Sequence, residues 1–270
     1  MGKVKIKKKS TLIDMTAMSD VTVLLLTFFM LTSTFLTKEP TTVQTPSSVS
    51  EEMIPAKDLV TVLVSSADKN VNNPDPTAIE GKIFLAFTGD SVISSESIRE
   101  QVLTTAVAKY NDKHKNKVTL NAKMVSNFKK ANMLGMPFKD MEEILSMESS
   151  EIDKLMTELG NPKVGIPING NKEKDGNLND FQVWMWALAK VATDKRGEAI
   201  ENAGLVDGVD VQKIRDLDIL YNSLYQGRGV SIKADRDTPF GKINEVFDNL
   251  QTMGLNKFTL QTALKTDQEQ

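Results

Sequence analysis

The stretch that decides the fold is LIDMTAMSDVTVLLLTFFMLTSTFLT, residues 12–37. Between Met15 and Leu36 its only charged side chain is Asp20. A helix rises about 1.5 Å per residue, so this segment is long enough for a hydrocarbon core about 30 Å thick. The pattern predicts one transmembrane helix over residues 12–37.

The residues on either side of this segment predict its orientation. No acidic residue comes before Asp14, whereas the flank after the segment carries Lys38 and then Glu39. The basic residues before the segment are Lys3, Lys5, Lys7, Lys8 and Lys9. Because basic residues stay on the cytoplasmic side of a membrane, we expect residues 1–11 to be a cytoplasmic tail and the rest of the chain to lie outside the cytoplasm.

Two other structures are alternatives to a membrane anchor for this segment. A cleaved signal peptide has an apolar core of only about 7–15 residues and ends at a small-residue site, which Ser33, Thr34 and Phe35 do not supply. A buried helix of a soluble domain does not suit this length and position. A membrane anchor is therefore the prediction.

Asp20 is the residue that distinguishes this anchor from a plain one. A carboxylate at the centre of a membrane helix costs about 2.5–3.5 kcal/mol on insertion scales, so it usually has a function. Thr16, Thr27 and Thr34 lie on the same helical face as Asp20. The alternative is that Asp20 reaches the cytoplasmic headgroups, but snorkelling is mainly a property of the longer Lys and Arg. Since lipid cannot hydrogen-bond this stripe, we predict that it faces a pore or a protein partner, with Asp20 as a proton-binding site.

At these residues the chain resembles a known family. The sequence IDMTAMSD, residues 13–20, followed by VTVLLLTFFMLTSTF, is similar to the signature of the ExbD/TolR family of biopolymer-transport proteins. The single helix of that family carries one essential Asp near its cytoplasmic end, and Asp20 falls at that position. Ala17 stands where the family usually has Pro.

The resemblance implies a function and partners. Two copies of the anchor, as a homodimer, would sit in a pentameric ring of an ExbB/TolQ-like protein of the inner membrane. Proton uptake and release at Asp20 would then drive a periplasmic domain that acts on a TonB-like or TolA-like protein, for outer-membrane transport or envelope maintenance. The alternative is a signal-anchored periplasmic scaffold that binds peptidoglycan or a protein partner without proton transport.

Composition excludes several other classes of protein. The net charge is −3 and the Lys and Arg residues are scattered outside the N-terminal cluster, so no nucleic acid is expected. The chain has no Cys, and its single His, His114, lies in a charged run that predicts a solvated helix end. No catalytic or nucleotide-binding motif occurs. We therefore expect no enzyme activity, no cofactor and no metal site.

Residues 38–57 contain Pro40, Pro46 and Pro55 among many Ser and Thr, which predicts an extended linker.

Residues 58–270 are predicted to form a periplasmic α/β (α+β) domain. It begins with strands at Leu59–Val64 and Lys82–Phe87, of which the first is predicted to be an exposed edge that a partner strand can join. A helix capped by Ser94 or Ser95 then runs to about Lys113. Its expected buried positions are Ile98, Val102, Ala106 and Tyr110.

The C-terminal part repeats the strand-then-helix pattern. A strand is predicted at Gly229–Asp235, and Thr238 is predicted to cap a helix that begins with Pro239. The expected apolar stripe of this helix is Phe240, Ile243, Phe247, Leu250 and Met253. After Gly254 a last strand is predicted at Asn256–Ala263. This ending also resembles the end of ExbD/TolR periplasmic domains.

The middle of the domain, residues 118–227, is predicted to be a helical elaboration. The expected helices are 136–147, 150–159 with a Ser150/Asp153 capping box, 179–193 along Phe181, Trp184, Leu188 and Val191, and one capped by Asp210 that carries Ile214, Leu217, Tyr221 and Leu224. Trp186 is expected to be half-buried. The predicted architecture is thus one N-terminal transmembrane helix and a periplasmic α/β (α+β) domain with a helical central elaboration.

Overall fold

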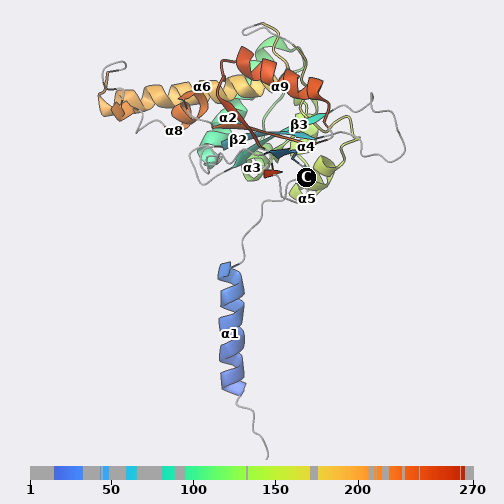
Figure 1. Ribbon diagram of the computed structural model, residues 1–270, viewed down its shortest axis with the longest axis vertical. Coiled ribbons are helices and arrows are strands. Elements are labelled where there is room, and N and C mark those ends of the chain that lie inside the picture. Colours follow the sequence, from blue (N-terminus) through green and yellow to red (C-terminus); the bar gives the residue numbers. More distant parts are fainter. Residues whose placement is uncertain are drawn as a thin grey trace, which may run out of the picture. The chain divides into compact units, whose positions relative to one another are not determined.

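The computed structural model describes residues 15–32, 43, 45–48, 59–65, 81–88, 95–131, 133–170, 176–206, 210, 212–214, 219–226, 229–236, 238–261 and 263–264. The chain divides into two compact units, residues 1–38 and 39–270. Figure 1 shows the elements of each unit.

The first unit contains one described helix, α1, Met15–Thr32. It lies within the predicted segment 12–37, and the described side chains from Met18 to Leu31 are exposed. Among the residues that the structure describes, none of the helices reaches the length and apolar character needed to cross a membrane. The helix itself is therefore present, and its passage through a membrane stays a prediction.

The second unit is built on a five-stranded mixed sheet with the order β4-β3-β2-β5-β6. Antiparallel pairs join β2 (Leu59–Ser65) to β3 (Lys82–Thr88), and β3 to β4 (Met133–Leu134). Parallel pairs join β2 to β5 (Val230–Ala234), and β5 to β6 (Phe258–Gln261). The strands predicted from alternating or β-branched runs are confirmed.

The predicted position of the first strand in the sheet is wrong. Val60 of β2 pairs with Phe87 on one side and with Val230 on the other, so β2 lies in the middle of the sheet. Both of its faces are buried, which suits the continuous β-branched run Leu59–Val64. A partner strand therefore cannot pair with β2, because both edges of β2 are already paired within the sheet.

A second, two-stranded sheet joins the linker to the C-terminal segment. Strand β1, Ser47–Ser48, pairs in parallel with β7, Ala263–Leu264. Part of the segment predicted as an extended linker is therefore a short strand. Extended chain of this kind forms a strand wherever a neighbour offers unpaired backbone groups.

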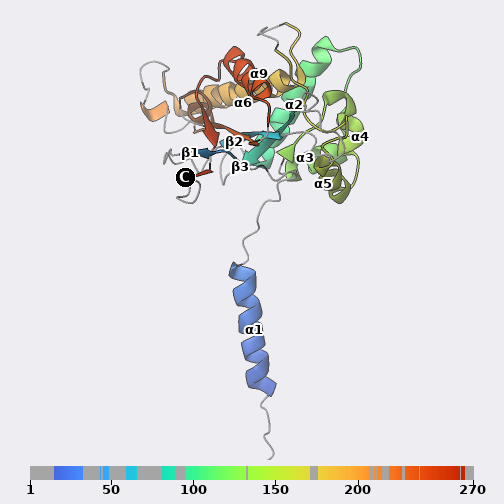
Figure 2. The same ribbon diagram turned by 45° about the vertical axis from the view of Figure 1, so that its right-hand side comes forward.

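Helix α2, Glu96–Lys113, agrees with its prediction. Ser95 is the N-cap, and its hydroxyl oxygen accepts a hydrogen bond from the backbone N–H of Ile98 at 3.3 Å. The predicted stripe on this helix is buried at all four positions, Ile98, Val102, Ala106 and Tyr110. In Figures 1 and 2, α2, α6 and α9 lie over the same side of the sheet.

The central elaboration is helical, as predicted. Its elements are α3 (Ala122–Lys130), η3 (Phe138–Asp140), α4 (Met141–Leu145), α5 (Ser149–Thr157), α6 (Asp180–Ala203), α8 (Ile219–Tyr221) and the π-helix η4 (Asn222–Gln226). The capping box of α5 is formed by Glu148 and Glu151, not by Ser150 and Asp153.

Helix α6 continues beyond the predicted end at Thr193. It ends at Gly204, whose backbone is left-handed, a conformation that Gly adopts without strain. Leu217 lies outside the described residues, and Asp210 accepts the N–H of Ile214 through its backbone carbonyl.

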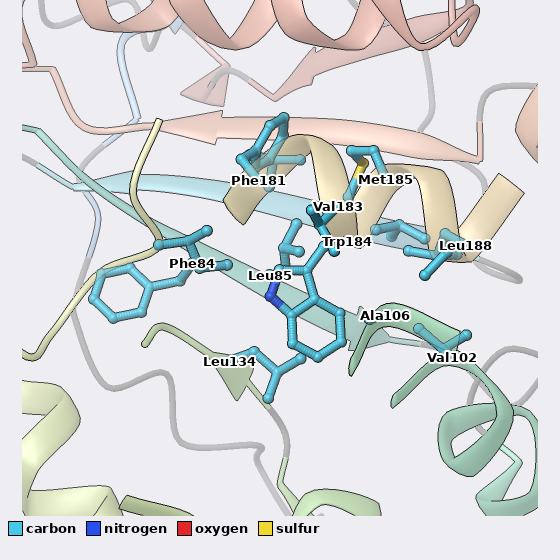
Figure 3. Packing of buried hydrophobic residues seen from close by; sticks show 14 of the residues in the cluster. Phe84, Leu85, Val102, Ala106, Leu134, Phe181, Val183, Trp184, Met185 and Leu188 are labelled. Carbon is cyan, nitrogen blue, oxygen red and sulfur yellow. The ribbon is translucent and has the colours of Figure 1, made fainter. Parts of the chain in front are cut away.

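The elaboration shares one hydrophobic core with the sheet. Figure 3 shows Trp184 pointing from α6 toward Leu134 of β4, with Val102 and Ala106 of α2 beside it. The predicted stripe on α6 is buried, namely Phe181, Trp184, Leu188 and Val191. The central helices are therefore part of the domain's core and not a separate module.

Helix α9, Phe240–Thr252, turns most of its predicted stripe toward the core, because Leu250 is buried and Ile243, Phe247 and Met253 pack against the core. Its first position and one polar residue differ from the prediction. Phe240 is 72% exposed, whereas Asn249 is fully buried and donates from Nδ2 to the carbonyl oxygen of Asn169 at 2.8 Å. The expected cap at Thr238 is also wrong, because its hydroxyl donates to the carbonyl oxygen of Val64 at 3.3 Å. The burial of Asn249 and the hydrogen bond of Thr238 both depend on partners distant in sequence, which a periodic pattern does not contain.

Candidate functional site

The candidate proton site lies on α1. Asp20 is the only charged residue between Met15 and Thr32, and its side chain is exposed. No hydrogen bond or ion pair joins its carboxylate to any residue that the structure describes. The carboxylate therefore has all of its acceptor capacity available to an outside partner.

The threonines of the same helix behave differently. The hydroxyl of Thr27 donates to the carbonyl oxygen of Leu24 at 2.9 Å, and that of Thr22 donates to the carbonyl oxygen of Ser19 at 2.8 Å. Such bonds satisfy a hydroxyl donor within its own helix. Of the predicted stripe, Asp20 and Thr27 lie seven residues apart on α1, Thr16 lies in its first turn, and Thr34 is outside the described residues.

The single histidine has a different environment from the predicted one. His114 does follow the end of α2, as expected, but it is half-buried. Its ring stacks on Tyr110, with centroids 3.9 Å apart, and Tyr110 stacks on Phe138 at 4.7 Å. Phe138 in turn stacks on Trp184 at 5.0 Å, so a continuous row of aromatic rings runs from His114 into the core.

A half-buried carboxyl group lies close to this row of rings. Asp180, in the first turn of α6, accepts a hydrogen bond from the backbone N–H of Phe138 at 2.8 Å. Burial raises the pKa of Asp180, and the Phe138 bond opposes that effect. Asp180 and His114 line one cavity of about 240 Å³. Sequence reasoning missed this pair because His114, after the end of α2, and Asp180, at the start of α6, lie far apart in the sequence.

Trp186 behaves as expected and is half-buried. The ammonium of Lys109 lies 4.6 Å from the centroid of its ring, a cation–π contact between α2 and α6. Among the described residues, no group of three or more His, Cys, Asp or Glu side chains is placed to hold a metal ion.

Residues 7–133 match the family described as biopolymer transport protein ExbD/TolR. This match covers α1, the strands β2 and β3, and helices α2 and α3, but not α6 or the C-terminal elements β5, α9 and β6. Neither the curated proteins nor the solved structures provide a match to this chain.

Proposed function

Because this chain belongs to the ExbD/TolR family of biopolymer transport proteins, we propose that it is the ExbD-like subunit of a proton-driven motor of the inner membrane. Membership in the family implies energy transduction for biopolymer transport in general. The proposal adds a mechanism. Protons bind to and leave Asp20, and the resulting movement of α1 is passed to the second unit.

The observation that carries the proposal is the state of Asp20. It is an exposed carboxylate with no described hydrogen-bond partner, on an otherwise uncharged helix that lies within the matched residues 7–133. Such a group is stable in a membrane only against a protein partner or water. An ExbB/TolQ-like ring around two copies of α1 would supply that partner.

The energy available is sufficient for such a movement. One elementary charge that crosses the membrane releases about 2.3 kcal/mol per 100 mV. A few protons per step could therefore supply the free energy to move a folded domain. No cofactor is required for this chemistry, since the reacting group is a carboxyl.

The second unit would act on a TonB-like or TolA-like protein in the periplasm. Strand β2 is central, so among the described strands the sheet ends at β4 and β6. Beside β4, the N–H of Ile166 donates to the carbonyl oxygen of Ile83 at 2.8 Å, which occupies part of that edge. Strand β6 carries no charged side chain, and its Leu260 is 46% exposed. We therefore propose β6 as the edge that an extended segment of the partner joins.

The orientation is part of the same proposal. The basic residues before α1 favour a cytoplasmic N-terminus and a periplasmic second unit. A reporter enzyme fused after Gln270 tests this directly, because only a periplasmic C-terminus activates a reporter that requires export. Activity of a cytoplasm-specific reporter at the same position would exclude the orientation.

The decisive experiment replaces Asp20 by Asn. Asn has nearly the same shape but cannot ionise, and as a neutral amide it costs less to insert than a carboxylate, so the variant should still be inserted and assembled. We expect growth that depends on energised outer-membrane uptake to fall to the level of a deletion. Asp20→Glu keeps an ionisable group and should retain part of the activity.

Thr22→Val is the matched control in the same helix, because the hydroxyl of Thr22 is bound to its own backbone. It should leave growth unchanged. Full activity of Asp20→Asn, at normal abundance, would instead support the scaffold alternative, in which Asp20 transfers no proton.

A further inference from the structure

The cavity beside His114 lies at the meeting point of three segments. His114 follows the last turn of α2, Pro167 and Ile168 belong to the segment before α6, and Leu178 and Asp180 lie at the start of α6. The volume is about 240 Å³. This is below the roughly 300–1,000 Å³ of pockets for drug-sized ligands, so the cavity suits a small group or the end of a side chain.

Asp180 gives the cavity a carboxyl group that forms no ion pair with any residue the structure describes, although the charges of His114 and Lys139 act on it from a distance. Oδ2 accepts the N–H of Phe138, and within the described part of the chain no ion pair involves Asp180. The nearby Lys139 is mostly exposed and lies 3.9 Å from Asp140 instead. Asp180 is half-buried, and a carboxylate withdrawn from water is stabilised when a cation pairs with it. The first turn of α6 and the Phe138 bond stabilise the charge in part, yet burial still raises the pKa of this carboxyl group.

His114 adds a second acceptor. Its Nδ1 lies 2.9 Å from the carbonyl oxygen of Tyr110, which can only accept, so Nδ1 carries the proton in the neutral ring. Nε2 is then left with a lone pair and without a described hydrogen-bond partner. Stacking on Tyr110 fixes the plane of the ring. The negative end of the α2 dipole lies at the same place and favours a cation.

We propose that this cavity binds a primary ammonium group carried on an aliphatic chain. An ammonium has three donors and no acceptor, which complements the carboxylate of Asp180 and Nε2 of His114. The side chains of Pro167, Ile168 and Leu178 offer apolar surface to the attached methylene groups. The amide of Asn179 is already engaged with Gln182, Asn169 and Asn249, so it does not compete for the site.

The ammonium can belong to a free small amine or to a lysine-like side chain of a macromolecule. The chemistry of recognition is the same in both cases. The inference does not depend on proton transfer at Asp20, because the two groups belong to different units of the chain. Loss of activity in Asp20→Asn and loss of ammonium binding are therefore separate results.

The single histidine provides a direct test. The full chain, purified in detergent without a histidine tag and labelled with isotopic histidine, gives imidazole resonances from His114 alone. Addition of n-butylammonium chloride at pH 7.5 should shift these resonances with saturation, whereas n-butanol and sodium chloride at equal concentrations should not. In Asp180→Asn, whose amide oxygen can still accept the Phe138 N–H, binding should weaken at least tenfold.

Equal responses to butylammonium and to butanol, or an unchanged affinity in Asp180→Asn, would overturn the proposal, as would the absence of a saturable shift. If Asp180→Asn does not fold, saturation transfer from the protein to the butylammonium methyl group measures binding to the wild type and to His114→Phe. Binding in the wild type that is lost in His114→Phe supports the site, and equal binding refutes it. Nα-acetyl-lysine N-methylamide distinguishes a free amine from a lysine-like side chain as the natural ligand. It should bind like butylammonium if the natural ligand is a lysine-like side chain, and it should not bind if the natural ligand is a free amine.

Discussion

Arg99 donates a hydrogen bond from Nη2 to the backbone carbonyl oxygen of Phe87 at 3.1 Å, although its side chain is buried. Nη1 donates to the carbonyl oxygens of Lys129 at 2.9 Å and Ala131 at 2.7 Å. Burial lowers the pKa of Arg99, and the neighbouring Glu96 opposes this effect. One guanidinium thus joins the end of β3 to the C-terminal end of α3, where the helix dipole favours a cation.

Replacement of Arg99 by Met should destabilise the second unit. Three carbonyl oxygens would lose a charged donor. The contact with Phe87 is buried and the other two are part-buried. An unsatisfied buried group costs about 1–3 kcal/mol, so we expect a loss in this range or above it. Arg99→Lys is the control, because it keeps the charge but lacks the planar fork, and it should lose less. Urea unfolding of the full chain in detergent measures both variants, and a Met variant within 1 kcal/mol of wild type would contradict this role.

Replacement of Asp180 by Asn should change how stability depends on pH. Because its pKa in the folded chain is raised above the ordinary value of 3.8, the folded state favours the protonated carboxyl. That contribution is fully present below pH 3.8 and is lost as the pH rises through the raised pKa. The Asn variant should therefore gain stability relative to wild type between pH 4 and pH 7.

Thermal unfolding at four pH values in this range measures the difference. Asp153→Asn, at an exposed position on α5, is the control and should show a difference that stays nearly constant with pH. A wild type that becomes more stable than Asp180→Asn as the pH rises would contradict the assigned direction.

Two glycines should respond to alanine in opposite ways. A Cβ at Gly135 would lie 2.0 Å from Cδ1 of the fully buried Phe84, so Gly135→Ala should cost about 1–3 kcal/mol or more. A Cβ at Gly197, in the interior of α6, would meet nothing within 4 Å. Gly197→Ala should therefore stabilise the chain by about 0.5–1 kcal/mol. The shift of the urea unfolding midpoint from that of the wild type measures each effect. Shifts of the same sign in the two variants would contradict the packing described at Gly135 or at Gly197.

A charge on the β6 edge should block the proposed docking of the partner. Leu260→Lys places an ammonium on the strand, which natural edge strands use to prevent pairing. We expect cross-linking to a TonB-like or TolA-like partner in membranes to fall at least tenfold. Val206→Lys, at another exposed apolar position that is 60% exposed, is the matched control. Equal cross-linking in all three proteins would exclude β6 as the docking edge.

The sequence by itself determined the local structure of this chain. Ser95 and Asn179 are N-caps because their side-chain oxygens reach backbone N–H groups three residues ahead. The β-branched run at Leu59–Val64 forms a strand, and the single charge in residues 15–36 marks Asp20 before any tertiary contact is known. The match to ExbD/TolR over residues 7–133 agrees with the resemblance seen at Asp20. The caps and the strand each depend on residues within a few positions of one another.

The tertiary structure alone decided which surfaces are covered. The run at Leu59–Val64 is equally compatible with an edge and a centre, and only pairing with β3 and β5 places β2 in the middle. On α9, Asn249 is buried because Asn169 and Asn179 are its hydrogen-bond partners from distant segments. His114 and Asp180 share a cavity only because α2 and α6 pack together. Hydrophobic periodicity predicts which face of a helix packs against the core. It does not predict which polar side chains are buried, because the free energy of burying them depends on hydrogen-bond partners far along the chain.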